Sequence, residues 1–143
     1  MSHVSKIGLE ITDLTALKLA CKEMGLEFIE NQTTYKWYGK LVNVQDTQLP
    51  EGLTEKDLGK CTHAISVPNA EYELGVLRYK GKYIILCDWW DSKLKLKIGK
   101  DANLLKQEYT VQRIKAEARK QRFRFNKQHT KEGGIKITLT QAA

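Results

Sequence analysis

Residues 72–90, YELGVLRYKGKYIILCDWW, decide the fold of this chain. Two runs that are rich in β-branched and aromatic residues, 72–79 and 83–90, flank a three-residue turn that contains Gly81. This pattern predicts a β-hairpin. The second run is apolar on both faces from Tyr83 to Cys87, which is typical of a central strand that is covered on both sides.

Four further segments have the composition of strands. Residues 3–11 alternate in hydrophobicity, residues 26–30 form a short run with Leu26 and Phe28 inward, and residues 34–44 are rich in β-branched and aromatic side chains. Residues 63–68 form a run that ends in proline, which cannot continue a strand ladder. Together with the hairpin, these segments predict a mixed or mainly antiparallel sheet.

Two segments have helical periodicity. After Thr12 or Asp13, either of which can cap a helix, apolar residues recur at helical spacing, and Gly25 stands at the expected C-terminal cap. A second helix is expected to begin at Asp101, which would cap it, and to run to about Gln121.

The last part of the chain changes its period from that of a helix to that of a strand. In RFRF, residues 122–125, alternation turns the two phenylalanines inward and the two arginines outward. A turn with two glycines follows at 131–134, and apolar residues then alternate again up to Leu139, so a second hairpin is expected. Its outer face is predicted to carry Arg122, Arg124, Lys136, Thr138 and Thr140.

These elements predict a single α+β domain over residues 1–143. The expected architecture is a mixed or mainly antiparallel sheet with two helices packed on one face. The polar segment 45–62, which contains Pro50 and Gly52, predicts an irregular insertion with one helical turn at 54–58.

The composition suits a globular protein. The chain has 143 residues, of which 41% are hydrophobic and 29% charged, so one core can fold it without disulfides or metal. Its longest apolar runs are too short to span a bilayer. The N-terminus lacks an apolar signal region and the three cysteines are scattered, which favours a reducing, intracellular location.

Positive charge is concentrated in the C-terminal half. The whole chain has 24 basic and 17 acidic residues, a net charge of +7. Residues 93–131 alone contain 13 basic and 3 acidic residues, a net +10, which leaves −3 for the rest. This asymmetry indicates a polyanionic partner such as RNA, DNA or a nucleoprotein. The alternative is that the lysines only keep helix faces and strand edges soluble.

Both ends of the chain resemble a known family. The opening MSHVSKI, a first helix that ends in a Met-Gly turn, and the segment LLKQEYTVQRIKAEARKQRF…EGGIKITL are similar to a domain-of-unknown-function family. That family includes a conserved hypothetical plastid reading frame of algae and its cyanobacterial, bacterial and phage relatives. The hairpin GVLRYKGKYIILCDWW resembles it less closely, and the insertion 45–62 and the tail QAA depart from its pattern. The resemblance implies a small α+β protein of the cytoplasm, of the plastid stroma if algal or of the host cytoplasm if from a phage, and it implies no reaction.

Residues suited to catalysis or metal binding are sparse. Cys61 and His63 alternate to the same face of a predicted strand, so they could supply two metal ligands or a thiol and its base. A structural zinc site needs two close ligand pairs, and a cysteine nucleophile needs a third, orienting group. Cys21 and Cys87 lie in apolar patterns and are expected in the core. We therefore expect no catalytic residue, no metal and no cofactor; a small Cys/His enzyme is the third interpretation.

The tetrapeptide Asp88-Trp89-Trp90-Asp91 ends the predicted central strand, a place where binding sites often lie. Strand alternation directs its two carboxylates to opposite faces, which argues against a paired-acid site. Trp89 is expected to pack beside Cys87. Trp90 is the candidate surface aromatic for contact with a protein partner.

The basic residues around the second helix and the terminal hairpin are the candidate nucleic-acid contacts. Because Phe123 and Phe125 are expected to face inward, stacking of bases on them is not predicted. The basic side chains could follow phosphates without reading sequence. The candidates are Arg113, Lys115, Arg119, Lys120, Arg122, Arg124 and Lys136.

The sequence thus favours a small non-catalytic binding protein whose basic C-terminal half binds nucleic acid or a nucleoprotein such as the ribosome. The alternative is an accessory subunit that binds a protein partner through an exposed sheet edge and Trp90. No membrane partner is expected.

Overall fold

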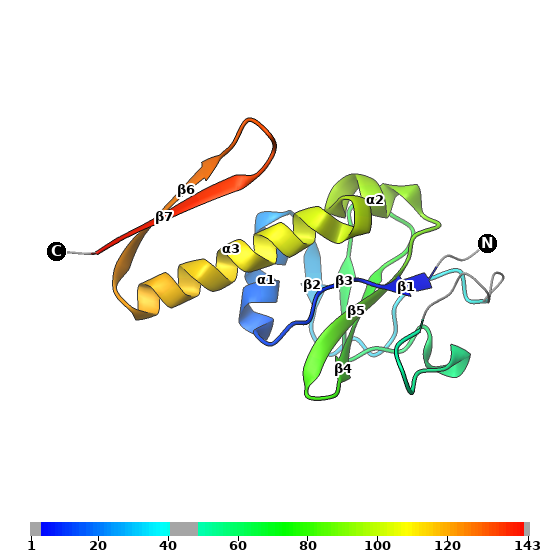
Figure 1. Cartoon of the computed structure of the whole chain (residues 1–143). Coiled ribbons are helices and arrows are strands. Elements are labelled where there is room, and N and C mark those ends of the chain that lie inside the picture. Colours follow the sequence, from blue (N-terminus) through cyan, green and yellow to red (C-terminus); the bar gives the residue numbers. More distant parts are fainter. Residues whose placement is uncertain (1–3, 41–48, 142–143) are drawn as a thin grey trace.

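A five-stranded antiparallel sheet organises the chain, in the order β1-β5-β4-β3-β2 (Figure 1). The structure is a computed structural model, and it describes residues 4–40 and 49–141. The strands of this sheet are β1 (Val4–Lys6), β2 (Glu27–Ile29), β3 (His63–Ser66), β4 (Leu74–Tyr79) and β5 (Lys82–Asp88). The hairpin predicted from 72–90 is β4–β5, at the centre of the sheet.

The turn of this hairpin is one residue shorter than expected. Tyr79 pairs with Lys82, so only Lys80 and Gly81 lie between the strands. Both turn residues have positive φ, 49° and 79°, as a two-residue type I′ turn requires. This turn is favoured because its twist matches that of the two strands, and it places Lys82 in β5.

Strand β5 is covered on both faces, as predicted. Ile85 and Cys87 point into a core beneath the helices, which we call the helix-side core. Ile84 and Leu86 point into a smaller core on the opposite face, which we call the second core. All four side chains are buried, which explains why the run is apolar in both alternating sets.

The first helix, α1 (Leu14–Glu23), begins and ends where the sequence predicts. The Asp13 side chain is its cap, with Oδ1 accepting a hydrogen bond from the Ala16 N–H at 3.0 Å. Gly25 follows the helix with φ of 72°, a conformation that glycine adopts without steric cost.

The second predicted helix, α3 (Asn103–Lys120), begins later than expected. Asp101 does not cap it, because Asp101 and Ala102 have positive φ, 51° and 56°, at a kink. The Asp101 carboxylate instead accepts a hydrogen bond from Lys106 Nζ at 2.9 Å. The kink also turns the chain from a short preceding helix into α3.

That short helix, α2 (Ser92–Ile98), was not predicted. Its sequence SKLKLKI alternates like a strand, although only Leu94 and Ile98 are buried, four residues apart on one helical face. Leu96, which gives the sequence its strand-like alternation, is 81% exposed.

All three α-helices contribute side chains to the helix-side core, together with β3, β4 and β5. The sheet therefore carries its helices on one face (Figure 1), and the predicted α+β class is confirmed. One helix more than expected lies on that face.

The opposite face of the sheet is covered by irregular chain. Residues 34–40 are not a strand, which corrects the prediction for 34–44; residues 41–44 lie outside the described residues. Only Thr34 forms an isolated bridge, with Lys60. The Tyr35 N–H donates to the Gly59 carbonyl at 2.9 Å and the Glu73 N–H donates to the Lys36 carbonyl at 2.9 Å. These scattered bonds dock aromatic side chains into the second core instead of extending the sheet.

The predicted insertion 45–62 is irregular where it is described, with one 3₁₀ turn at Glu55–Asp57; residues 45–48 lie outside the described part. Leu58 of this segment is buried in the second core. The insertion thus supplies part of the cover over one face of the sheet.

The predicted N-terminal strand is interrupted. Strand β1 pairs with β5 up to Lys6, and Ile11 rejoins the same partner by pairing with Tyr83. Residues 8–10 loop out between them, while Ile7 and Ile11 remain fully buried. Residue 3 of the predicted strand lies outside the described residues.

In residues 4–40 and 49–141, no helix combines the length and the apolar character needed to cross a membrane.

Candidate nucleic-acid interface

The C-terminal hairpin is a separate two-stranded sheet of β6 (Phe123–His129) and β7 (Ile135–Gln141). Seven residue pairs are in register, from Phe123 with Gln141 to His129 with Ile135. The Thr130 N–H donates to the Gly134 carbonyl at 2.9 Å, and the Thr130 Oγ1 accepts from the Gly134 N–H at 2.9 Å, so the loop is closed by its own bonds. Figure 1 shows the hairpin beside α3 and remote from the five-stranded sheet.

The inner face of the hairpin packs against α3. A shallow cleft between the two is lined by Val111 and Ile114 of α3 and by Ile135 and Ile137 of β7. Phe125, which lies on the same face of the ribbon, is half-buried. The hairpin is therefore held to the rest of the fold through α3.

The inward orientation predicted for Phe123 is only partly realised. Phe123 lies on the inner face, but its side chain is 37% exposed, and that of Leu139 is 43% exposed. Both lie toward the open end of the ribbon, where α3 does not cover them. The sequence predicted correctly which side chains share the inner face of the hairpin. How deeply each of them is buried depends on how far α3 extends along that face.

The outer face of the hairpin is entirely polar and exposed. The register pairs Arg124 with Thr140, Asn126 with Thr138 and Gln128 with Lys136 across this face. We call these six residues the ribbon face. Arg124 and Lys136 share it as predicted, but they lie four register positions apart, roughly 13 Å along the strands.

Arg122 does not belong to the ribbon face, which corrects the prediction. It lies in the turn between α3 and β6 with φ of 61°, and its N–H donates to the Arg119 carbonyl at 3.2 Å. The chain needs this turn to reverse from the helix into the strand, so regular alternation begins only at Phe123. Arg122 thus lies beside the end of α3.

The basic residues of α3 occupy sides of the helix other than the one that meets the hairpin. Lys115 and Arg119 are four residues apart and share one side, and Arg113 and Lys120 are seven apart and share another. All four are exposed. The seven candidates therefore do not form one continuous strip. These four residues of α3 are called the helix group, Arg122 lies in the turn, and Arg124 and Lys136 lie on the ribbon face.

None of the seven candidates is neutralised by an ion pair in the described part of the chain. The ion pairs found there use Lys18, Lys80, Lys82 and Lys106. The one acidic residue in the second half of α3, Glu117, accepts a hydrogen bond from Gln121 Nε2 at 2.8 Å. The surface around the end of α3 and the hairpin is thus strongly positive.

Two residues of this surface were not singled out from the sequence. Asn126 and Gln128 extend the outward alternation of RFRF through the whole of β6. The signal was present, because strand period alone places them outward, but the search for candidates followed charge and both residues are neutral.

Cys61 and His63 do not form the pair that the sequence allowed. The chain bends at Thr62, before β3 begins, so Cys61 packs against the second core while His63 is on the helix side. Cys61 Sγ donates to the Gln32 carbonyl at 3.1 Å. Burial raises the pKa of the Cys61 thiol to about 11, which disfavours the nucleophilic thiolate at neutral pH.

His63 has a structural role. Its Nδ1 accepts a hydrogen bond from the Asn31 N–H at 2.9 Å, and its ring lies 5.3 Å from that of Phe28 and 5.8 Å from that of Tyr83, centroid to centroid. Burial lowers the pKa of His63, with an opposing effect from Glu30. Its neutral form is therefore the one that fits the fold.

A loss of stability on mild acidification is expected from this histidine. Because its pKa is lower in the folded state, the unfolded chain binds a proton first as the pH falls below about 6.5. The free energy of unfolding should therefore decrease from pH 7.5 toward pH 5. His63→Gln, which keeps an acceptor but does not titrate, should flatten this part of the profile in urea unfolding measured at several pH values.

The control for this prediction is His129→Gln, on the exposed hairpin. It should keep the acid-sensitive profile of the wild type. An unchanged profile in His63→Gln would assign the pH dependence to another group.

The tetrapeptide at the end of β5 is held by backbone contacts. Asp88 is fully buried and accepts hydrogen bonds from the N–H groups of Tyr38 and Trp90, both at 3.1 Å. Asp91 caps α2 through the Lys93 N–H at 3.0 Å. Both carboxylates therefore hold the backbone in place through hydrogen bonds, and they do not face each other as a pair of catalytic acids.

The two tryptophans differ as the sequence suggested. Trp89 packs against the helix-side core, and its Nε1 donates to Ser5 Oγ at 2.9 Å. Trp90 is 53% exposed. It lies in the turn that follows β5, and its exposed side chain remains available for contact.

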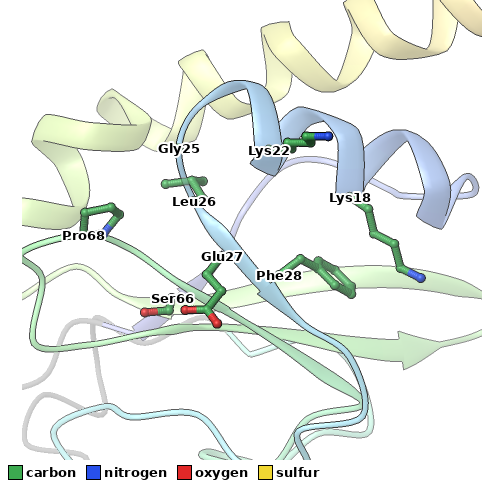
Figure 2. A pocket seen from close by; sticks show the side chains of 8 residues that line it. All are labelled: Lys18, Lys22, Gly25, Leu26, Glu27, Phe28, Ser66 and Pro68. Atoms are coloured by element: carbon green, nitrogen blue, oxygen red, sulfur yellow. The ribbon is translucent and has the colours of Figure 1, made fainter.

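A shallow groove of about 610 Å³ lies at the opposite edge of the sheet, between the end of α1 and β2 (Figure 2). Lys18 at its rim pairs with Glu30 at 2.8 Å and lies 5.6 Å from the centre of the Phe28 ring. Its lining has no histidine, no cysteine and no pair of carboxylates. Its ionisable and hydroxyl groups are those of Glu27, Ser66 and two lysines.

Within residues 4–40 and 49–141, no group of three or more His, Cys, Asp or Glu side chains is arranged to hold a metal ion. Compared with models of known protein families, with curated proteins and with solved structures, the chain shows no match. The resemblance to the plastid reading-frame family stays a prediction.

Proposed function

We propose that the chain is a non-catalytic nucleic-acid-binding protein that uses its basic C-terminal half. The observation that carries this proposal is the exposed positive surface around the end of α3 and the hairpin. Residues 113–141 contain nine basic and two acidic residues. The seven candidate side chains among them are exposed and have no ion pair within the described residues.

Such a surface favours polyanions for a simple reason. Each phosphate neutralised by Lys or Arg releases condensed counterions, so binding is strong at low salt and weakens steeply as salt is added. The helix group and the ribbon face lie on different sides of the α3–hairpin unit. A nucleic acid bound at both would have to curve around this unit, or two strands would have to bind at once.

A protein partner is the second candidate function. The exposed side chain that favours it is Trp90, because large exposed aromatics are enriched in protein interfaces. Trp90 follows β5, whose partner β1 is the edge strand of the sheet among the described residues. Binding at this site would be far less sensitive to salt than phosphate binding.

The test of nucleic-acid binding removes two charges near the base of the hairpin. Arg122→Gln with Arg124→Gln should leave the thermal melt nearly unchanged, because both side chains are exposed. Binding to single- and double-stranded RNA and DNA is measured by filter binding at three salt concentrations. Each lost phosphate contact should flatten the plot of log affinity against log salt by roughly 0.7 to 0.9.

The matched control is Lys56→Gln with Lys60→Gln. It removes the same charge from exposed lysines in the segment that lies at the far end of the molecule from the hairpin (Figure 1). This control should keep the wild-type slope. Equal losses of affinity in the two double mutants would mean that only net charge matters. If the wild type binds no nucleic acid at low salt, the proposal is wrong and the protein-partner function is the one that stays.

A further inference from the structure

The ribbon face has the chemistry of a surface that reads bases. Its six side chains are one arginine, one lysine, one asparagine, one glutamine and two threonines, and it carries no acidic and no apolar residue. These are the side-chain types that recognise base edges in the major groove: Arg and Lys with guanine, Asn and Gln with adenine, and Thr with the thymine methyl. A face needed only for solubility would not require the two amides.

These side chains are not used by the fold. Within residues 4–40 and 49–141, the six make no side-chain hydrogen bond and no ion pair. The ribbon is held from its other side, through the contacts of Ile135 and Ile137 with α3. Its polar side is therefore both exposed and supported by a rigid helix.

The shape of the ribbon suits duplex DNA. Two paired strands of seven residues each extend roughly 20 Å, and the major groove of B-form DNA, about 12 Å wide, admits a two-stranded ribbon. Side chains of one face project from both strands at successive register pairs and so reach several base pairs. The base of the ribbon lies next to the last turn of α3, which carries Arg119 and Lys120, and next to Arg122. Phosphates of a bound duplex would pass there.

We propose that the β6–β7 hairpin enters the major groove of double-stranded DNA and reads sequence with the ribbon face. This inference rests on the proposed nucleic-acid binding and deepens it, since phosphate contacts alone would give affinity without sequence preference. The neutral residues Asn126 and Gln128 then carry specificity, and the basic residues carry most of the affinity.

Duplex RNA is the poorer ligand for this geometry. The major groove of A-form RNA is deep and narrow, so side chains on a ribbon cannot reach the base edges there. The ribbon also has no exposed aromatic on its polar face, so it lacks the stacking platform by which single strands are commonly bound. The expected order of affinity is duplex DNA above duplex RNA and single strands at the same salt concentration.

The experiment selects DNA with the full-length wild-type chain from a pool of duplexes that contain 20 random base pairs. The selected duplex and a shuffled duplex of equal composition are then titrated with each variant. Gln128→Ala should reduce the preference for the selected duplex about 5- to 150-fold, the effect of one bidentate contact. Asn126→Ala should act similarly, and neither should change the salt slope on the shuffled duplex, because both residues are uncharged.

The matched control is Gln141→Ala, which removes the same side chain from the same hairpin but from its inner face. It should leave the preference unchanged, and thermal melts of all three variants verify that they fold. If the wild type binds DNA in a salt-dependent way but no sequence is enriched, or if Gln128→Ala and Gln141→Ala behave alike, base reading by the ribbon is wrong and the proposed function stands. If no nucleic acid is bound at low salt, the proposed function itself fails.

Discussion

Ile85→Asp should abolish folding. Ile85 lies at the middle of β5, pairs with Val76 and is fully buried in the helix-side core. An aspartate there would place a carboxylate in an apolar core without a partner, which is among the most costly single changes that a protein can suffer. The variant should show no cooperative transition in thermal or urea unfolding followed by circular dichroism.

The control for this result is Leu96→Asp. Leu96 is also an aliphatic residue of the described fold, but its side chain is 81% exposed, so the same substitution should change the free energy of unfolding by less than about 0.5 kcal/mol. A cooperative melt of Ile85→Asp near the wild-type temperature would contradict the central position of β5.

Gly75→Ala should have the second large effect. A Cβ at position 75 would collide with Tyr35 Cδ1 and would lie 3.0 Å from its Cγ. Tyr35 is 4% exposed and packed in the second core, so the ring cannot swing aside. We expect a loss of about 2–3 kcal/mol in the free energy of unfolding, as for other overpacked cores.

Gly8→Ala is the matched control. The nearest atom to a Cβ at position 8 is the flexible Lys106 Nζ at 3.5 Å, so this change should be almost neutral. Urea unfolding of the two alanine variants measures the difference. Equal stability of both would mean that Tyr35 does not pack over β4 as the structure describes.

The elements with strong periodicity could be predicted from the sequence. The alternation and turn of 72–90 indicate the β4–β5 hairpin, and the spacing after Asp13 indicates α1. These predictions succeed because the local pattern and the tertiary packing agree there: the apolar positions of the pattern, apart from Trp90, face one of the two cores. The charge asymmetry also indicated where exposed basic side chains gather, near the end of α3 and the terminal hairpin; binding there stays a prediction.

The failures occur where local pattern and tertiary contacts disagree. Residues 34–40 have strand composition, but Tyr35 and Trp37 pack in the second core while the backbone there bonds to two different segments. Residues 92–98 alternate like a strand but form α2, because Leu94 and Ile98 find the helix-side core. Propensity is a weak preference in such short segments, and packing overrides it.

The sequence by itself determined the class of the fold, the central hairpin and the sign of the surface. These follow from composition and period, which are properties of the chain alone. Only the tertiary structure decided how the candidate residues are grouped. The turn at Arg122 removes it from the ribbon face, and the packing of β7 on Ile114 directs Gln128 and Asn126 to the exposed side. The reason is that strand alternation only sorts the side chains of the hairpin into two faces. Which of the two faces is exposed depends on which one packs against α3.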